Sequence, residues 1–162
     1  MKILILGLGR HGKDTVAEIL RDHFWFKVSS SSEFAAKTFI FDELKDKHGY
    51  RNWEECFEDR HNHRELWYTL IKEYNSENPS RLAEEMLGAG YDVYIGLRDD
   101  VELAECKRKR LFDLIIWVDA TERLGVTEDS SSCKVTAGMC DVVITNNGTQ
   151  TDLFGKVFKL FS

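Results

Sequence analysis

The chain has 162 residues and a formal net charge of −6, and its 43% apolar content suits one globular domain with a substantial core. The acidic balance disfavours a nucleic-acid partner, which would need a basic surface, and no apolar run approaches the roughly 18 residues of a membrane span. Four cysteines without a Cys-x-x-Cys pair favour free thiols in a reducing cytoplasm.

The hydrophobic pattern predicts strands that alternate with helices. Residues 2–7, KILILG, contain a continuous apolar run that ends in glycine, which is typical of a strand buried on both faces of a parallel sheet. Residues 13–24 have apolar side chains three and four positions apart, as a helix requires. The expected strands are 2–7, 25–30, 91–97, 111–120 and 141–148, and the expected helices are 31–47 (with Ser31 or Ser32 as N-cap), 50–76, 79–90, 99–110 and 149–161 in addition to 13–24.

This alternation predicts a doubly wound α/β fold, in which helices cover both faces of a parallel sheet. We expect a single domain over residues 1–162. Its helical insertion, about 33–90, is suited to closing over a substrate. Ligands in such folds bind beyond the carboxyl ends of the strands.

The segment GLGRHGKDT, residues 7–15, fits two phosphate-binding patterns. Gly7, Gly9 and Gly12 spell the dinucleotide fingerprint, whereas Gly7, Gly12 and Lys13 spell most of a P-loop. The dinucleotide pattern also needs an acid at the end of the second strand, and the nearest one, Glu33, lies beyond it. The lysine after the last glycine favours the P-loop. A dinucleotide loop, or a structural turn with a solvated lysine, remains the alternative.

A P-loop normally continues with Ser or Thr, whose hydroxyl ligates Mg²⁺. Here Asp14 takes that position and Thr15 follows it. A carboxylate can also hold a hard cation, so we expect Asp14 to bind Mg²⁺ and Thr15 to contact a phosphate oxygen. The residues expected to bind ATP are Gly9, Arg10, His11, Gly12, Lys13, Asp14 and Thr15.

At GRHGKDTVAEIL, the sequence resembles the P-loop deoxynucleoside monophosphate kinases of tailed bacteriophages, in which Lys-Asp-Thr is normal. Residues 91–120 and 141–161 are similar to two further stretches of that family. The resemblance implies a P-loop kinase fold with a five-stranded parallel sheet. It also implies Mg²⁺-dependent phosphoryl transfer from ATP to a (deoxy)nucleoside monophosphate, a homodimer, and the host-cell cytoplasm if the protein is viral.

Two departures from the family concern the metal and the lid. The family's third strand ends in Asp-x-Arg; Arg98 matches the arginine here, but Gly96 stands in place of the acid. The resemblance therefore shifts the metal role towards Asp14. The resemblance implies a lid-like loop at about 121–136 that closes over phosphate, and the only basic side chains of this loop are Arg123 and Lys134.

Phosphoryl transfer brings two polyanions together, and arginine suits their neutralisation because its planar group matches phosphate. We expect Lys13, Arg98 and Arg123 to be catalytic. We expect Arg60 and Arg64, four apart on one helix face, to contact the acceptor phosphate. Phe34 and Trp67 are candidates for stacking on the acceptor base. The alternatives are surface ion pairs for the arginines (Arg98 with Asp99 or Asp100, and Arg60 or Arg64 with Glu58 or Glu65) and core packing for the aromatic residues.

Three other functions stay open at this point. The chain could be a kinase of another small metabolite, such as dephospho-coenzyme A, on the same fold. It could also be a nucleotide-binding regulatory protein without turnover, since Gly96 and the few lid cations are unusual for an active kinase. An NAD-binding module is the last alternative.

Overall fold

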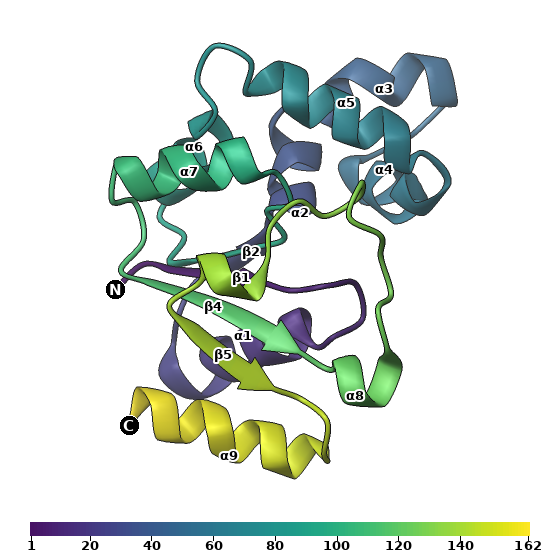
Figure 1. The fold of residues 1–162 in the computed structure, drawn as a ribbon. Coiled ribbons are helices and arrows are strands. Elements are labelled where there is room, and N and C mark those ends of the chain that lie inside the picture. The colour runs from purple at the N-terminus through teal and green to yellow at the C-terminus, as the bar shows by residue number, and fades with distance from the viewer.

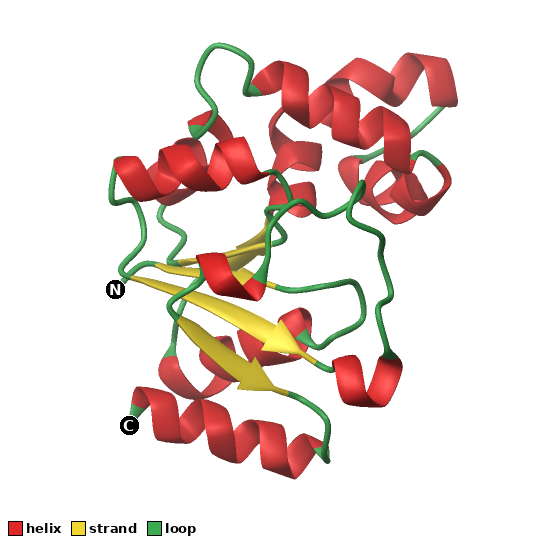
Figure 2. Cartoon of the chain, viewed as in Figure 1, coloured by secondary structure: helices red, strands yellow, loops and turns green.

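The computed structural model describes residues 1–162 as an α/β structure built on one five-stranded sheet (Figures 1 and 2). All strand pairs are parallel, and the strand order is β2-β3-β1-β4-β5. The predicted fold class is therefore confirmed. The strands are β1 (Ile3–Leu6), β2 (Val28–Ser30), β3 (Val93–Ile95), β4 (Leu114–Asp119) and β5 (Val142–Thr145).

Helices cover both faces of the sheet, as Figure 1 shows. Side chains along β1 alternate between the two faces, so that Ile3 and Ile5 enter one core and Leu4 and Leu6 enter the other. On the first face, the apolar sides of α1 (Lys13–Phe24) and α9 (Gln150–Phe161) complete the core. On the second face, α2 (Ser31–Ala35), α6 (Arg81–Gly88) and α7 (Asp100–Arg108) contribute the larger core.

The helical insertion between β2 and β3 is more broken than its sequence pattern predicts. The expected N-cap, Ser31 or Ser32, is wrong, because α2 already begins at Ser31 and its N-cap is Ser30, whose hydroxyl accepts a hydrogen bond from Glu33 N at 3.0 Å. A π-helical turn then leads into α3. The insertion comprises α2, the π-helical turn Ala36–Ile40, α3 (Phe41–His48), α4 (Trp53–Glu58), the 3₁₀ turn Asp59–Asn62, α5 (Arg64–Tyr74) and α6.

The single helix expected over residues 50–76 is wrong, since a 3₁₀ turn separates α4 from α5. The carboxylate of Asp59 holds this turn. It accepts hydrogen bonds from the Tyr50 hydroxyl at 2.5 Å and from Asn62 Nδ2 at 2.6 Å, and it lies 3.2 Å from His63 Nε2. Polar side chains that bond to one another in this way stabilise a turn in place of a continuous helix.

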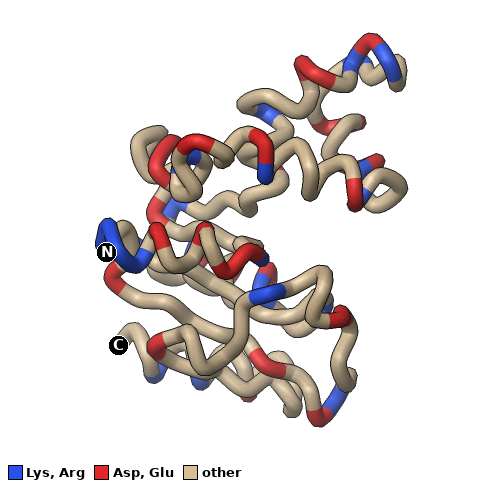
Figure 3. Tube along the Cα trace, turned by 45° about the horizontal axis from the view of Figure 1, so that its top comes forward, with Lys and Arg blue, Asp and Glu red and all other residues tan.

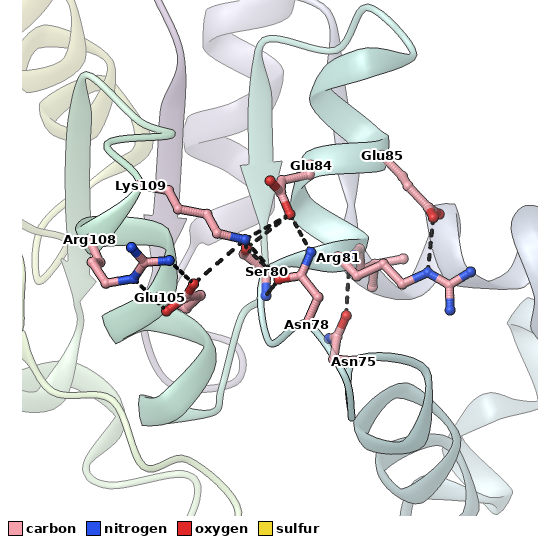
Figure 4. A network of polar contacts seen from close by, with 10 residues as sticks. Asn75, Asn78, Ser80, Arg81, Glu84, Glu85, Glu105, Arg108 and Lys109 are labelled. Atoms are coloured by element: carbon pink, nitrogen blue, oxygen red, sulfur yellow. Dashed lines mark hydrogen bonds and ion pairs between the residues drawn. The ribbon is translucent and has the colours of Figure 1, made fainter.

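A polar network joins the end of the insertion to α7 (Figure 4). Lys109 Nζ donates to Asn78 Oδ1 and to Ser80 Oγ, both at 2.9 Å, and lies 3.3 Å from a carboxylate oxygen of Glu84. These partners precede or begin α6. The network therefore anchors the carboxyl-terminal end of the insertion on the layer that packs against the sheet.

The loop between β4 and β5 contains two short helical turns that the sequence pattern does not indicate, α8 (Thr121–Leu124) and the 3₁₀ turn Ala137–Met139. Figure 3 shows acidic and basic residues interspersed along the helices, so the charges are not segregated by sign. None of the helices has the length and apolar character that a membrane span would need.

Candidate phosphate-binding site

The predicted site residues outside the insertion follow the carboxyl ends of β1, β3 and β4, and the strand order puts the loop of Gly7–Gly12 at the centre of this edge. β1 lies between β3 and β4, and α1 begins directly after the loop at Lys13. Backbone N–H groups at a helix start, with the helix dipole, favour an anion at this position. The segment thus has the strand–loop–helix context that a P-loop requires.

The side chain of Lys13 folds back over the loop. Its ammonium donates to the carbonyl oxygens of Gly7 at 2.7 Å and Leu8 at 2.9 Å. Burial, helped by the positive charge of Arg98, lowers the pKa of Lys13 to about 8. A desolvated cation of this kind gains most from an anionic ligand, because the charge interacts more strongly where water is excluded.

His11 does not point toward a ligand. Its side chain is fully buried, Nδ1 accepts a hydrogen bond from Ala120 N at 2.9 Å, and Nε2 lies 3.0 Å from the carbonyl oxygen of Gly125. Because an amide N–H only donates and a carbonyl only accepts, these partners select the neutral ring with its proton on Nε2. The imidazole therefore holds the loop in place, and the expected contact of residue His11 with ATP stays a prediction.

Asn146, at the end of β5, supports the same loop from another strand. Its buried side chain donates from Nδ2 to the carbonyl oxygen of His11 at 3.0 Å. The sequence places Asn146 after a strand, but no local pattern indicates that its amide reaches a residue 135 positions earlier.

Arg98, at the ligand edge after β3, forms an ion pair with Glu128 rather than with the expected alternatives, Asp99 and Asp100. Asp99 instead caps α7, where its carboxylate accepts from Glu102 N at 3.1 Å. Sequence reasoning missed Glu128, because nothing local distinguishes it from other acids of an exposed loop. The segment that carries it lies across the P-loop, and Thr127 Oγ1 donates to Gly9 O at 2.5 Å.

Arg60 lies near the start of α1, although not in the arrangement expected. Arg60 belongs to the 3₁₀ turn while Arg64 begins α5, so the prediction that the two arginines share one helix face is wrong. Its guanidinium centre lies 3.8 Å from the centre of the Phe57 ring, and it donates to Phe57 O at 2.9 Å. Burial lowers the pKa of Arg60, and the negative charge of Asp14 opposes this effect. The insertion thus brings a half-buried cation to the P-loop side of the molecule.

Three other expected site residues have structural partners. Trp67 is only 4% exposed and lies in the larger core, and Phe34 also lies there, with its ring edge-to-face with Tyr91. Both side chains therefore pack in the core, as the alternative interpretation had it, and the prediction that they stack on the acceptor base is wrong. Arg123 is exposed and donates from Nε to Asn146 O at 3.2 Å, so its guanidinium is engaged with the β5 loop.

Asp14 is exposed in the first turn of α1, and the structure has no cluster of three or more His, Cys, Asp or Glu side chains placed to hold a metal. Mg²⁺ usually takes one or two protein carboxylates and completes its octahedron with substrate phosphates and water, and its binding by Asp14 stays a prediction. Gly96, where an acid is expected by resemblance, has φ of +96°, and a Cβ there would lie 3.2 Å from Ser31 Oγ. The backbone thus disfavours an acid at this position.

The sequence matches no protein-family profile and no curated protein. Among solved structures, the chain is similar to TT1252 from Thermus thermophilus, with a TM-score of 0.52 and 16% identity, over 99% of this chain and 96% of that one. At this identity, the likeness shows the α/β fold with its parallel sheet.

Proposed function

We propose that the protein is an ATP-dependent kinase that phosphorylates a deoxynucleoside monophosphate to its diphosphate. The observation that carries this proposal is the placement of Lys13. Its ammonium lies over a glycine loop between the central strand and α1, and Arg98 and Arg60 add cations from two other parts of the chain.

The ATP phosphates bind the loop N–H groups and Lys13, and the acceptor monophosphate lies beneath the insertion, near Arg60 and Arg98. An oxygen of the acceptor phosphate then bonds to the γ-phosphorus while the bond to the β–γ bridging oxygen breaks, which leaves ADP. Positioning and charge neutralisation carry most of the catalysis in such reactions. Mg²⁺ beside Asp14 would offset the negative charge of the β- and γ-phosphates.

The test is to incubate the protein with ATP, Mg²⁺ and each of dTMP, dGMP, dCMP and dAMP, and to measure ADP formation. Lys13→Ala is expected to lower kcat/KM at least about a hundredfold, because removing a preorganised charge at a developing anion has effects of this size. Lys159→Ala, on the far end of α9, is the matched control and keeps the wild-type rate.

Absence of ADP with every monophosphate would refute the proposal. Tight ATP binding without turnover would favour a regulatory protein, and thermal stabilisation by NAD but not by ATP would favour the dinucleotide alternative.

A further inference from the structure

We propose that Glu128 is an internal competitor for the phosphate site: its carboxylate occupies a position that a phosphoryl group of the substrate takes, and substrate must displace it. This inference rests on the proposed function, since it assigns a phosphate site to the P-loop. It adds a residue that neither the P-loop pattern nor the resemblance indicates.

The position of the carboxylate is the first argument. One oxygen, Oε2, pairs with Arg98 Nη1. The other, Oε1, lies only 2.5 Å from the point where a side-chain Cβ on Gly9 would stand. The carboxylate therefore lies directly on the backbone of the loop, between the P-loop and the arginine at the end of β3.

Charge is the second argument. The Glu128 side chain is only 9% exposed, and a carboxylate that is so buried requires cationic partners. Arg98 supplies one of them, and Lys13 is close enough for the negative charge of Glu128 to favour its protonated form. The carboxylate thus uses the two cations that the proposed reaction assigns to phosphate.

The segment that carries Glu128 is held at both ends, and between them it contacts the glycine loop through Glu128 and through Thr127 Oγ1, which donates to Gly9 O at 2.5 Å. At one end, Gly125 O lies 3.0 Å from His11 Nε2; at the other, Lys134 N donates to Arg98 O at 2.9 Å and Val135 is buried. Between these anchors, Val126 is 72% exposed, and Asp129 makes a turn of its own with Ser131 and Ser132. Because residues 126–132 add no buried side chain to the hydrophobic core, an outward swing breaks the Thr127–Gly9 bond and the Glu128–Arg98 pair but leaves the core intact.

Two anionic groups do not share one desolvated site, so phosphate binding requires the carboxylate to leave. The apparent affinity for the ligand is then reduced by the fraction of molecules in which the site is open. If the open state is about one molecule in ten, removal of the competing charge raises the affinity about tenfold.

The experiment measures binding of inorganic tripolyphosphate by isothermal titration calorimetry to the wild-type protein, Glu128→Gln and Glu128→Ala. Glutamine keeps the shape without the charge, and alanine also removes the residual contact with Arg98. Glu122→Gln, an exposed acid of α8 in the same loop, is the matched control for net charge.

We expect both Glu128 variants to bind tripolyphosphate about tenfold more tightly than the wild type and the control to match it. Unchanged or weaker binding by both variants would overturn the inference. ADP formation separates it from the proposed function. If the wild type forms ADP and binds tripolyphosphate as tightly as both variants do, the inference about Glu128 is refuted and the kinase proposal stands. If both variants bind tripolyphosphate more tightly but no ADP forms, the kinase proposal is refuted and the inference about Glu128 stands.

Discussion

The side-chain amide of Asn146 donates a hydrogen bond to the carbonyl oxygen of His11 at 3.0 Å, which ties the end of β5 to the glycine loop of Gly7–Gly12. The His11 imidazole continues this connection to Ala120 N and Gly125 O. The loop is therefore held by the ends of two strands as well as by its own backbone, and under the proposed function this preorganises it for phosphate.

Asn146→Ala should destabilise the protein and weaken ATP binding. The change leaves the buried carbonyl of His11 without this partner, and such a loss costs about 1–3 kcal/mol. Urea unfolding monitored by circular dichroism measures the free energy of unfolding, and calorimetry measures the affinity for ATP. Gln150→Ala, at an exposed position of α9, is the control. Equal stability of Asn146→Ala and the control would show that the bond does not support the loop.

Gly96→Asp should lower stability rather than restore a metal ligand. A non-glycine residue at φ of +96° is strained, and its Cβ would crowd Ser31 Oγ at 3.2 Å, so we expect a loss of about 1–3 kcal/mol. Gly96→Ala separates the backbone effect from the charge. Gly88→Ala, in open space within α6, is the control and should be neutral or slightly stabilising. A stable Gly96→Asp protein with tighter Mg²⁺ binding would contradict this prediction.

Glu102 should make stability fall as pH rises from about 4.5 to 7. Burial raises the pKa of its carboxyl to about 7, and the hydrogen bond from Asn75 Nδ2 at 2.9 Å only partly opposes this shift. Because the folded state binds the proton more tightly than the unfolded state, the contribution is fully present below pH 4.5. It is lost as pH rises through 7, by on the order of 3 kcal/mol.

Glu102→Gln tests this contribution, since the amide keeps an acceptor for Asn75 without a charge. Denaturant unfolding at pH 5 and pH 8 should show a smaller difference for the variant than for the wild type, with the variant the more stable at pH 8. Glu77→Gln, in the loop before α6, controls for the change in net charge. Parallel pH profiles for wild type and Glu102→Gln would show that Glu102 does not titrate in this range.

Local pattern was sufficient for the sheet and for most helices. The apolar run at residues 3–6 and the amphipathic spacing of residues 13–24 are properties of neighbouring residues, and both elements form where the pattern predicts them. The bounds of α1 agree residue for residue. The prediction of a single helix over residues 50–76 is wrong for a local reason as well, because the polar contacts of Asp59 stabilise a turn there.

The candidate site was predictable only in part, for a related reason. Gly7–Lys13 is one continuous motif, so its loop and its lysine are visible in the order of residues, and Arg98 is visible as a residue that follows a strand. The side chains around this loop come from elsewhere in the chain, and their directions depend on packing. That is why the pattern does not show that the His11 imidazole turns toward Ala120, or that Trp67 packs in the core where a stacking role was expected.

Residue order alone determined the alternation of strands and helices, the fold class and the glycine loop with Lys13, because each depends on residues close together in the chain. Only the folded molecule decided that Glu128 lies on the loop beside Arg98, that His11 faces Ala120 and Gly125, and that Arg60 approaches Asp14. The parallel sheet brings the carboxyl ends of its strands to one edge. Contacts at that edge join residues that can lie more than a hundred positions apart, and no local pattern encodes them.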